Sequence, residues 1–324
     1  MTRDVAVIIP AYNAASHLLD ALKSLDGQAH VTEICVACYD SQTRAVAHSF
    51  TPADAHVTYT VIDNPSGTTP DALNAALAHT TASFVARLDA HATFTHGYLL
   101  TAVEVLSTTD VANVGGIQRP TATLRFQRGV AAALASVAGS GGVAYRVGTQ
   151  AKDVDTVYLG VFRRDALVAV GGFNPACLRN QDAELNIRLR QAGFRVRFDP
   201  RLIATYTPRS TVAGLARQYY AYGRWRRFTH KRTGEPFGLR QLLLPALLTI
   251  LTGSVTVALL WLNAWFLLPV GGYGMIITAA GLHAAVTHPA TRMSDTLNVI
   301  MALAVMHLAW GSGFMRGAPK KDSR

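Results

Sequence analysis

An acid and an imidazole that follow a short apolar run are well suited to chemistry. Asp89 and His91 come directly after the run 83–88 and are separated by one residue. If the chain continues as an extended strand, both side chains face the same way. A carboxylate and an imidazole suit a divalent cation, and such a cation suits a diphosphate. An Asp-x-His triplet also occurs without function, so this hypothesis depends on the rest of the chain.

A second acidic cluster precedes a segment with helical spacing. Asp182 and Glu184 lead into a periodic apolar pattern that Gly193 ends. Carboxylates in the first turn of a helix are favoured by the positive end of its dipole. This position is compatible with catalysis and equally with simple helix capping.

The elements that would position these residues alternate between strands and helices. Apolar runs predict strands over 5–10, 33–37, 57–62 and 84–88. Helical spacing predicts helices over 16–25, capped by Ser16, and over 71–79 and 97–106. This alternation predicts an α/β domain with a mainly parallel sheet covered on both faces. Ligands bind beyond the carboxyl ends of such strands, so segments 10–13, 38–41, 63–66 and 89–91 are expected to converge on one site.

The usual glycine-rich phosphate cradles are absent from the sequence. The first strand ends in Pro10-Ala-Tyr-Asn13, which excludes the dinucleotide-binding turn. The glycine-rich segment 139–142 has no Lys-Ser/Thr pair after it, and we interpret it as a mobile loop that faces substrate or forms a turn. Without such a cradle, a diphosphate requires a metal ion and arginines for charge neutralisation.

Apolar segments change the character of the chain after about residue 240. Leu242–Leu262, Trp265–Val286 and Leu297–Phe314 are each about long enough to cross a bilayer. Three spans from a cytosolic domain would place Arg316 and the tail lysines outside, against the usual preference for cations on the cytoplasmic side. Two spans plus one re-entrant or interfacial segment would satisfy that preference. The sequence leaves both arrangements open.

The formal charge of +10 is concentrated just before these apolar segments. Between Arg195 and Arg232 lie ten Lys or Arg residues and one acid, Asp199. Aromatic residues interleave with these cations, as expected for an anionic membrane surface. A nucleic-acid partner, the other interpretation of basic-plus-aromatic sequence, is excluded by the adjoining membrane segments.

The N-terminus and the cysteines indicate a cytosolic catalytic domain. The chain enters its first predicted strand without a signal peptide, so this domain is expected in the cytoplasm, at the plasma membrane. Three cysteines fit a reducing compartment, and we interpret Cys35 and Cys38 as core residues and not as a metal or redox pair.

Several motifs taken together resemble glycosyltransferase family 2, whose members have the GT-A fold. The resemblance is strongest to the succinoglycan-type chain-extending membrane enzymes and covers about residues 5–240. The motifs that carry it occupy 7–13, 63–65, 87–92, 155–164, 171–173, 180–190 and 218–226.

The resemblance implies a role for each matching residue. Asp182 would be the general base, Glu184 would orient the acceptor or a loop, and Arg224, with Arg227, would stabilise the leaving group. Asp89 and His91 would hold Mg²⁺ or Mn²⁺. The donor-binding residues would be Pro10, Ala11, Tyr12, Asp40, Asp63, Asn64, Arg87, Asp89 and Trp225.

Two positions depart from the family pattern. The acid that usually ends the second strand is shifted to Asp40, which leaves the nucleobase open. Gln181 stands where a Glu normally precedes the base, which removes a negative charge and is expected to lower the pKa of Asp182 relative to a Glu-Asp pair.

The sequence therefore predicts a GT-A domain over 1–235 with a juxtamembrane segment at 209–232, a membrane domain over 236–316 and a basic tail over 317–324. The expected function is metal-dependent, inverting transfer of a sugar from a nucleotide-sugar donor to a polyprenyl-linked glycan in cell-surface polysaccharide biosynthesis. The alternatives are a polyprenyl-phosphate sugar synthase and a catalytically silent, membrane-tethered binding protein. Membrane lipids are the other expected partner.

Overall fold

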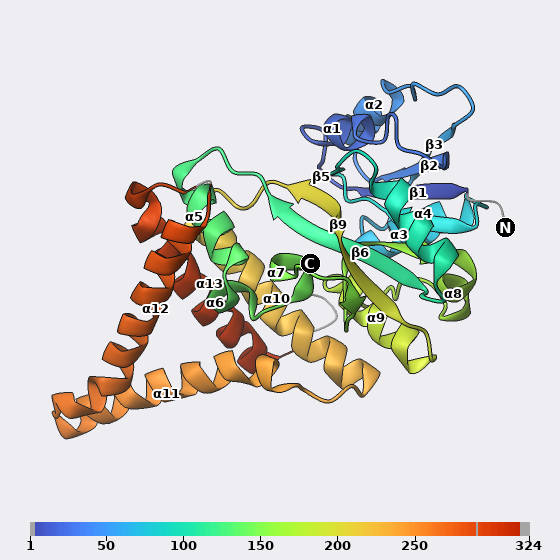
Figure 1. Ribbon diagram of the computed structural model, residues 1–324. Coiled ribbons are helices and arrows are strands. Elements are labelled where there is room, and N and C mark those ends of the chain that lie inside the picture. The colour runs from blue at the N-terminus through green and yellow to red at the C-terminus, as the bar shows by residue number, and fades with distance from the viewer. Residues whose placement is uncertain (1–3, 290, 318–324) are drawn as a thin grey trace. The chain divides into compact units, whose positions relative to one another are not determined.

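The computed structural model describes residues 4–289 and 291–317, which form two compact units (Figure 1). The first unit comprises residues up to 120 and 148–207, and the second comprises 121–147 and 208 onward. The predicted boundary near residue 235 differs from this division. Segment 121–147 and the juxtamembrane helix belong to the second unit because they pack on its last long helix.

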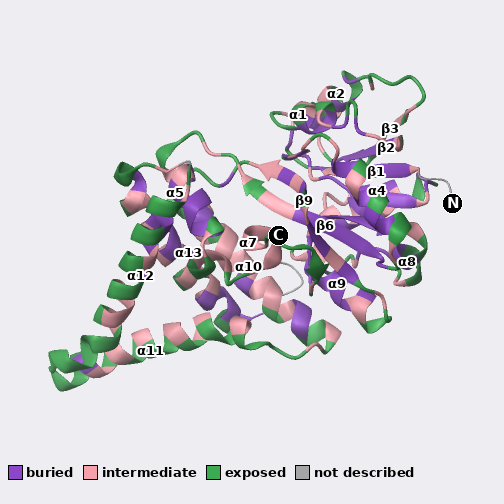
Figure 2. Cartoon of the chain, viewed as in Figure 1, coloured by how far each residue is buried: buried purple, intermediate pink, exposed green. Residues whose placement is uncertain are grey.

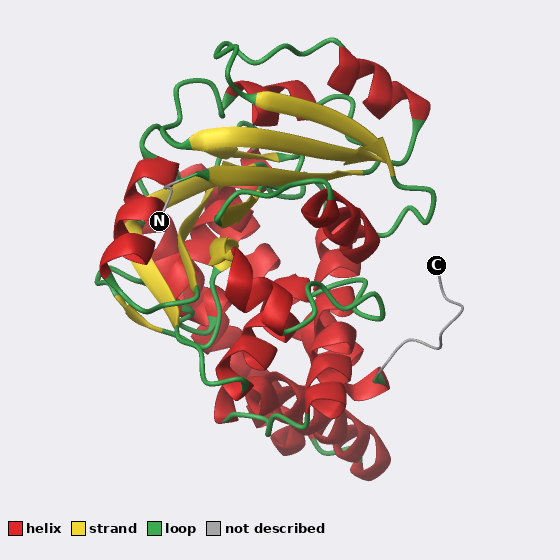
Figure 3. Ribbon diagram, turned by 90° about the vertical axis from the view of Figure 1, so that its right-hand side faces the viewer, coloured by secondary structure: helices red, strands yellow, loops and turns green. Residues whose placement is uncertain are grey.

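A mixed, mainly parallel sheet forms the core of the first unit. Its strands are β1 (Val5–Ala11), β2 (Val31–Cys38), β3 (Thr58–Asp63), β4 (Phe84–Arg87), β5 (Ala92–Phe94), β6 (Asn113–Pro120), β7 (Lys152–Asp153), β8 (Tyr158–Arg163) and β9 (Val196–Tyr206). Their order is β3-β2-β1-β4-β8-β6-β9-β5, with β7 paired to β9. β8 is antiparallel to β4 and β6, whereas β1–β4 are mutually parallel. Figure 3 shows these strands lying side by side in one layer.

Helices cover the sheet as the alternation predicts. They are α1 (Leu18–Lys23), α2 (Ser41–His48), α3 (Thr69–Ala78), α4 (Tyr98–Thr108), α8 (Arg164–Ala169) and α9 (Gln181–Gln191). The predicted strands and helices are confirmed to within a few residues, while α2 was not predicted. The predicted cap at Ser16 is wrong: α1 begins after His17, and no side chain caps it. The residues of β1 and β4 and the second half of β2 are almost entirely buried (Figure 2), and Cys35 and Cys38 of β2 lie in the core as predicted. Burial raises the pKa of Cys35 to about 12 and that of Cys38 to about 11.

The second unit is helical. It contains α5 (Arg125–Ala135), α6 (Val137–Ser140), α7 (Ala144–Val147), α10 (Val212–Thr233), α11 (Leu239–Trp261), η1 (Ala264–Leu267), α12 (Leu268–Thr287), η2 (Met293–Asp295) and α13 (Thr296–Arg316). Three helical segments, 239–261, 264–287 and 293–316, are long and apolar enough to cross a membrane. The interpretation of 139–142 as a mobile loop is wrong in part: Gly139 and Ser140 belong to α6, where Gly139 approaches the side chain of Leu303 on α13.

Candidate active site

Asp182 lies in the first turn of α9, as the sequence predicts. The preceding Asn180 has a left-handed backbone (φ 60°), which turns the chain sharply into the helix. The carboxylate of Asp182 is about one-fifth exposed. One of its oxygens therefore remains within reach of a substrate while the rest of the group is surrounded by protein.

Arg87 joins this carboxylate to Asp89 across the carboxyl end of β4. Its side chain is almost completely buried, and its Nη1 donates to Oδ1 of Asp182 at 2.7 Å. The Nε and Nη2 atoms donate to Oδ1 of Asp89 at 2.9 and 2.8 Å. The prediction that Arg87 binds the donor finds no support in these contacts, because both edges of its guanidinium are occupied by protein carboxylates. Arg87 instead holds the two acids on either side of itself.

Burial and the neighbouring charges shift the pKa values of Asp182 and Arg87. Burial raises the pKa of Asp182, Arg87 lowers it and Asp89 raises it again, with a net upward displacement from that of an exposed aspartate. Burial lowers the pKa of Arg87, but its two carboxylates more than offset this and raise it. One cation and two anions leave a net negative charge in a partly buried site. A site of this charge favours the binding of a further cation.

The strand argument for Asp89 and His91 is wrong. β4 ends at Arg87, and the chain turns immediately, with Ala92 N donating to the carbonyl of Asp89 at 2.9 Å. The side chain of His91 is exposed at this turn, while Asp89 is anchored through Oδ1 alone in the described part of the chain. An exposed imidazole and a carboxylate with one available oxygen are ligands that Mn²⁺ accepts, so these residues fit a divalent ion. Within the described residues, no cluster of three or more His, Cys, Asp or Glu side chains forms a metal site, so the remaining ligands would come from the donor and water.

Glu184 faces the interior, so it cannot contact an acceptor. It is 1% exposed. Its Oε1 accepts hydrogen bonds from Nδ2 of Asn174 and from Nε of Arg188, both at 2.9 Å. Nη2 of the same arginine donates to Oε2 of Glu184 at 2.7 Å and to the carbonyl of Gly172 at 2.8 Å. Of the two predicted roles, the contacts favour the orientation of a loop, here the turn at 171–174.

The predicted nucleotide pocket lies at the ends of β1 and β2. Pro10 and Ala11 close β1, and Tyr12 follows with its ring exposed beside Tyr39, the two ring centroids being 4.9 Å apart. Tyr39 was not among the predicted site residues, although an aromatic side chain directly after a buried strand is a signal for it. Two exposed aromatic rings beyond the carboxyl ends of parallel strands form a surface on which a planar group could stack.

Asp40 connects this region to α2. Its Oδ2 accepts from the backbone N of Asn13 and its Oδ1 from that of Thr43, both at 2.8 Å. Burial raises the pKa of Asp40, but these hydrogen bonds outweigh it and hold the pKa below its usual range. The observed contacts of Asp40 are therefore those of a helix cap that fixes the loop after β1.

The two predicted donor residues at the end of β3, Asp63 and Asn64, have different environments. Asp63 is exposed and pairs with Arg44 at 2.6 Å. Asn64 is buried, and its Nδ2 donates to the carbonyl of Thr68 at 3.1 Å, so it shapes the turn. Asp63 remains available at the surface, whereas the contacts of Asn64 are structural.

Arg224 and Trp225 lie on α10 in the second unit. The Nε of Arg224 donates to the carbonyl of Gly317 at 3.1 Å, and Trp225 packs edge-on against Phe228. The triad at Arg87 is built without them, so their role in catalysis and donor binding stays a prediction.

A buried polar network that the sequence did not reveal fixes α9 to the sheet. Nδ2 of Asn113 on β6 donates to Oδ1 of Asn186 at 2.7 Å, and Nδ2 of Asn186 donates to Oγ1 of Thr156 at 3.0 Å. Asn186 follows Asp182 by one helical turn, so this network also sets the position of the Asp182 carboxylate. A polar residue on the apolar face of the predicted helix was the available signal.

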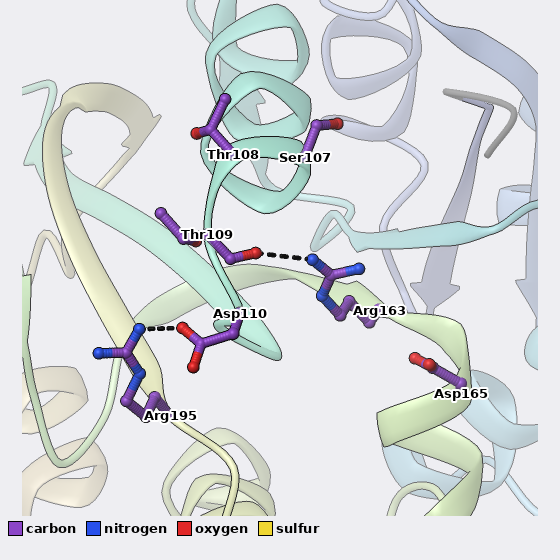
Figure 4. A pocket seen from close by; sticks show the side chains of 7 residues that line it. All are labelled: Ser107, Thr108, Thr109, Asp110, Arg163, Asp165 and Arg195. Carbon is purple, nitrogen blue, oxygen red and sulfur yellow. Dashed lines mark hydrogen bonds and ion pairs between the residues drawn. The ribbon is translucent and has the colours of Figure 1, made fainter.

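A surface hollow near the end of α4 lies at the amino ends of β6 and β9 (Figure 4). It is lined by Ser107, Thr108, Thr109, Asp110, Arg163, Asp165 and Arg195. Arg163 donates to the carbonyls of Thr109 and Val111, and Arg195 pairs with Asp110. Because Asp110 and Arg195 precede the starts of β6 and β9, the hollow lies away from the carboxyl ends, and its cations serve the fold.

Comparison with known proteins agrees with this geometry. The model of the family "Glycosyl transferase family 2" matches residues 6–166. The succinoglycan biosynthesis protein ExoA of Rhizobium meliloti (strain 1021) is 29% identical over 316 residues, which cover 96% of this chain and 93% of that protein. The mannosyltransferase PcManGT of Pyrobaculum calidifontis, solved with GDP-Man and Mn²⁺, has a TM-score of 0.58 at 19% identity and covers 95% of this chain and 86% of its own.

A fragment of S. aureus TarS (residues 1–349) has a TM-score of 0.50 at 14% identity, covering 96% of this chain and 90% of its own. These two structures support the GT-A-like fold. The match to the family model identifies this chain as a glycosyltransferase of family 2.

Proposed function

We propose that the chain is a membrane-anchored, metal-dependent inverting glycosyltransferase that extends a lipid-linked glycan in polysaccharide biosynthesis. The observation that carries the proposal is the buried Arg87, which holds the carboxylates of Asp89 and Asp182 on either side of one guanidinium. Similarity to ExoA over almost the whole chain supports the polysaccharide assignment. We place the first unit, which holds the proposed active site and is called the catalytic unit below, in the cytoplasm, where nucleotide sugars are available.

Asp182 is the general base in this mechanism. It accepts the proton of the acceptor hydroxyl while that oxygen forms the new bond to the anomeric carbon. The bond from the same carbon to the diphosphate breaks on the opposite face, and the nucleoside diphosphate leaves with the electron pair. Burial raises the pKa of Asp182, which makes this carboxylate a stronger base than an exposed aspartate.

Asp89 and His91 would hold Mg²⁺ or Mn²⁺ at the turn after β4. When bound, the ion supplies positive charge to the diphosphate leaving group. The use of Mn²⁺ with GDP-Man by the structurally similar mannosyltransferase supports this choice of metal and of donor class. Tyr12 and Tyr39 provide the stacking surface for the nucleobase, and Asp40 fixes the loop that carries Tyr12.

Donor identity is tested first by release of nucleotide. The purified protein in detergent is incubated with a panel of UDP-, GDP- and dTDP-sugars and with Mn²⁺, Mg²⁺ or EDTA. Slow release from one donor that EDTA abolishes is the expected result. Release that is unchanged by EDTA would contradict the metal assignment, and absence of both release and donor binding would contradict the enzymatic proposal.

The acceptor is tested with the donor so identified. Polyprenyl-diphosphate-linked oligosaccharide and polyprenyl phosphate are compared in parallel. Transfer to the oligosaccharide is expected, whereas transfer to the lipid phosphate alone would replace this proposal with the sugar-lipid synthase.

A further inference from the structure

The last long helix, α13, differs from the other two membrane candidates in its surroundings. In its most apolar window, 39% of the residues are buried within the protein, against 11% in the windows of α11 and α12. A helix that faces lipid on most sides is expected to have few residues buried by protein. α11 and α12 also pack on α13, but α10 and α5 contact it most extensively, and neither of these two is itself a membrane candidate.

Helix α10 runs alongside α13 in the same direction. Gly313 lies against the backbone of Tyr220, and one helical turn further on Gly317 accepts a hydrogen bond from Arg224. Gly223 lies against the backbone near Trp310, so a glycine on each helix permits the close approach. Because the paired positions advance together by one turn, the two helices stay side by side along this length.

This pairing excludes a position for α13 across the hydrocarbon. α10 carries six Lys or Arg residues, namely Arg217, Arg224, Arg226, Arg227, Lys231 and Arg232. A helix so charged does not cross a bilayer, because each cation at its centre is strongly disfavoured. If α13 crossed, α10 would be carried through with it.

The N-terminal end of α13 is fixed in the same way. Nε and Nη2 of Arg128 on α5 donate to the two oxygens of Asp295 at 2.8 and 3.0 Å, and Asp295 is completely buried. α5 and α10 follow β6 and β9 after the short connections 121–124 and 207–211. Both ends of α13 are thus bonded to helices that continue directly from strands of the water-soluble sheet.

We propose that only α11 and α12, with η1 between them, cross the membrane, and that α13 lies along the membrane surface with α5 and α10. The C-terminal tail then lies on the same side as the catalytic unit. Figure 1 shows α11 leaving one end of α13 and α12 returning to the other, so that the three helices form the sides of a triangle. The base is the surface layer, and the apex is the 261–267 turn.

The lengths of the three sides fit a bilayer. α11 has 23 residues, the segment of η1 and α12 has 24, and α13 has 21. At about 1.5 Å per residue, two sides of about 35 Å on a base of about 32 Å reach a depth of about 30 Å, the thickness of a hydrocarbon core. The apex holds no charge, Leu262 is 90% exposed, and Trp261 and Trp265 stand where interfacial tryptophans are favoured.

The arrangement also satisfies the distribution of cations. Arg292 and Arg316, which flank α13, would then lie on the same side of the membrane as the first unit, together with the basic α10. The choice left open by the sequence is thereby resolved in favour of two spans and one interfacial helix. This inference concerns topology and does not depend on the donor or the acceptor.

Labelling with a membrane-impermeant maleimide tests the topology in the full-length protein. Three single variants are compared in sealed vesicles of known orientation: Ser107→Cys on the catalytic unit, Asn263→Cys at the apex and Ser323→Cys in the tail. The three native cysteines are buried, and the wild-type protein measures their background. Labelling after detergent treatment shows that each introduced thiol is reactive.

The expected result is labelling of positions 107 and 323 from one side and of position 263 from the other. Labelling of 323 together with 263 would overturn the proposal in favour of three spans. Labelling of all three from one side would also overturn it, because the hairpin would then not cross. Protease accessibility of a C-terminal tag on the otherwise unmodified chain also shows on which side of the membrane the C-terminus lies, without an introduced cysteine.

Discussion

Arg87 places a full positive charge in the interior, and its two carboxylate partners are the reason it is tolerated there. A buried guanidinium is costly unless its donors are occupied by anions. The same contacts orient Asp89 toward the turn at His91 and Asp182 toward the first turn of α9. One arginine therefore couples the predicted metal ligand to the predicted base, so the two functions should respond together when it is changed.

Removal of the base should abolish most of the turnover without affecting donor binding. Asp182→Asn keeps the size of the side chain but cannot accept the proton, so kcat should fall about 10²–10⁴-fold. Donor affinity, measured by calorimetry with Mn²⁺, should remain near that of the wild type. Asp20→Asn on the exposed face of α1 is the matched control and should retain full activity. Equal activity of the two variants would contradict the assignment of Asp182.

Removal of the arginine should move the pH dependence of the reaction. In Arg87→Met the positive charge that lowers the pKa of Asp182 is lost, so this pKa rises and the base is protonated at a higher pH. The acid limb of the kcat/KM profile should shift to higher pH, and Tm should fall because two carboxylates lose their partner. Arg87→Lys, which keeps the charge, should shift the limb less. A shift to lower pH in the methionine variant would contradict this account.

His91 offers a test of metal binding that leaves the fold intact. Its side chain is exposed, so His91→Ala should leave Tm unchanged and weaken Mn²⁺ binding, seen as a higher Mn²⁺ concentration for half-maximal activity. His96→Ala, at another exposed histidine of the same unit, serves as control. Identical metal titrations for both variants would show that His91 is not a ligand.

At the scale of elements, α9 is positioned by polar contacts on its buried side. Asn186 binds the sheet through Asn113 and Thr156, while Glu184 and Arg188 hold the turn at 171–174. The carboxylate of Asp182, the proposed base, is therefore held in place by contacts on the buried side of its helix. Placement of a reactive group on a supported helix reduces the loss of rate that small displacements cause.

Loss of this support should reduce both stability and rate. Asn186→Ala leaves the amide of Asn113 and the hydroxyl of Thr156 without a partner, at a cost of about 1–3 kcal/mol for each unsatisfied group. We expect a lower Tm by thermal denaturation and a lower kcat, with KM for the donor little changed. Ser107→Ala, at an exposed position of α4, should be neutral in both assays. An unchanged Tm in Asn186→Ala would show that the network does not hold the helix.

At the scale of the whole molecule, the chain divides between a sheet unit and a helical unit that each have their own internal contacts. The helical unit is assembled from distant parts of the sequence, because α5 and α10 both pack on α13. The most deeply buried ion pair in it is Arg128–Asp295, whose acid is fully enclosed. This pair joins α5 to the start of α13, 167 residues further along the chain.

Disruption of the pair should loosen the helical unit. Arg128→Met leaves the carboxylate of Asp295 without its ion-pair partner, so the helical unit should become less stable. Thermal inactivation in detergent should begin at a lower temperature, with faster proteolysis of the chain. Arg125→Met, an exposed arginine in the same turn of α5, removes an equal charge and should have little effect. Similar losses in both variants would assign the effect to charge and not to the pair.

The sequence by itself determined the features that depend on local order. The alternation of strands and helices, the apolar C-terminal segments and the placement of Asp182 in a first helical turn follow from periodicity and composition, which neighbouring residues define. The order of several motifs was enough to indicate the family. These predictions held because each rests on a short stretch of chain.

Only the tertiary structure decided which of these residues meet. Arg87 contacts a carboxylate 95 residues away, Glu184 turns inward to Arg188, and the chain bends after Arg87 instead of continuing as a strand. Likewise, the apolar sequence of α13 is that of a membrane span, but its packing against a charged helix gives it other neighbours. Composition records how apolar a segment is, whereas its environment is set by contacts between segments that are far apart in the sequence.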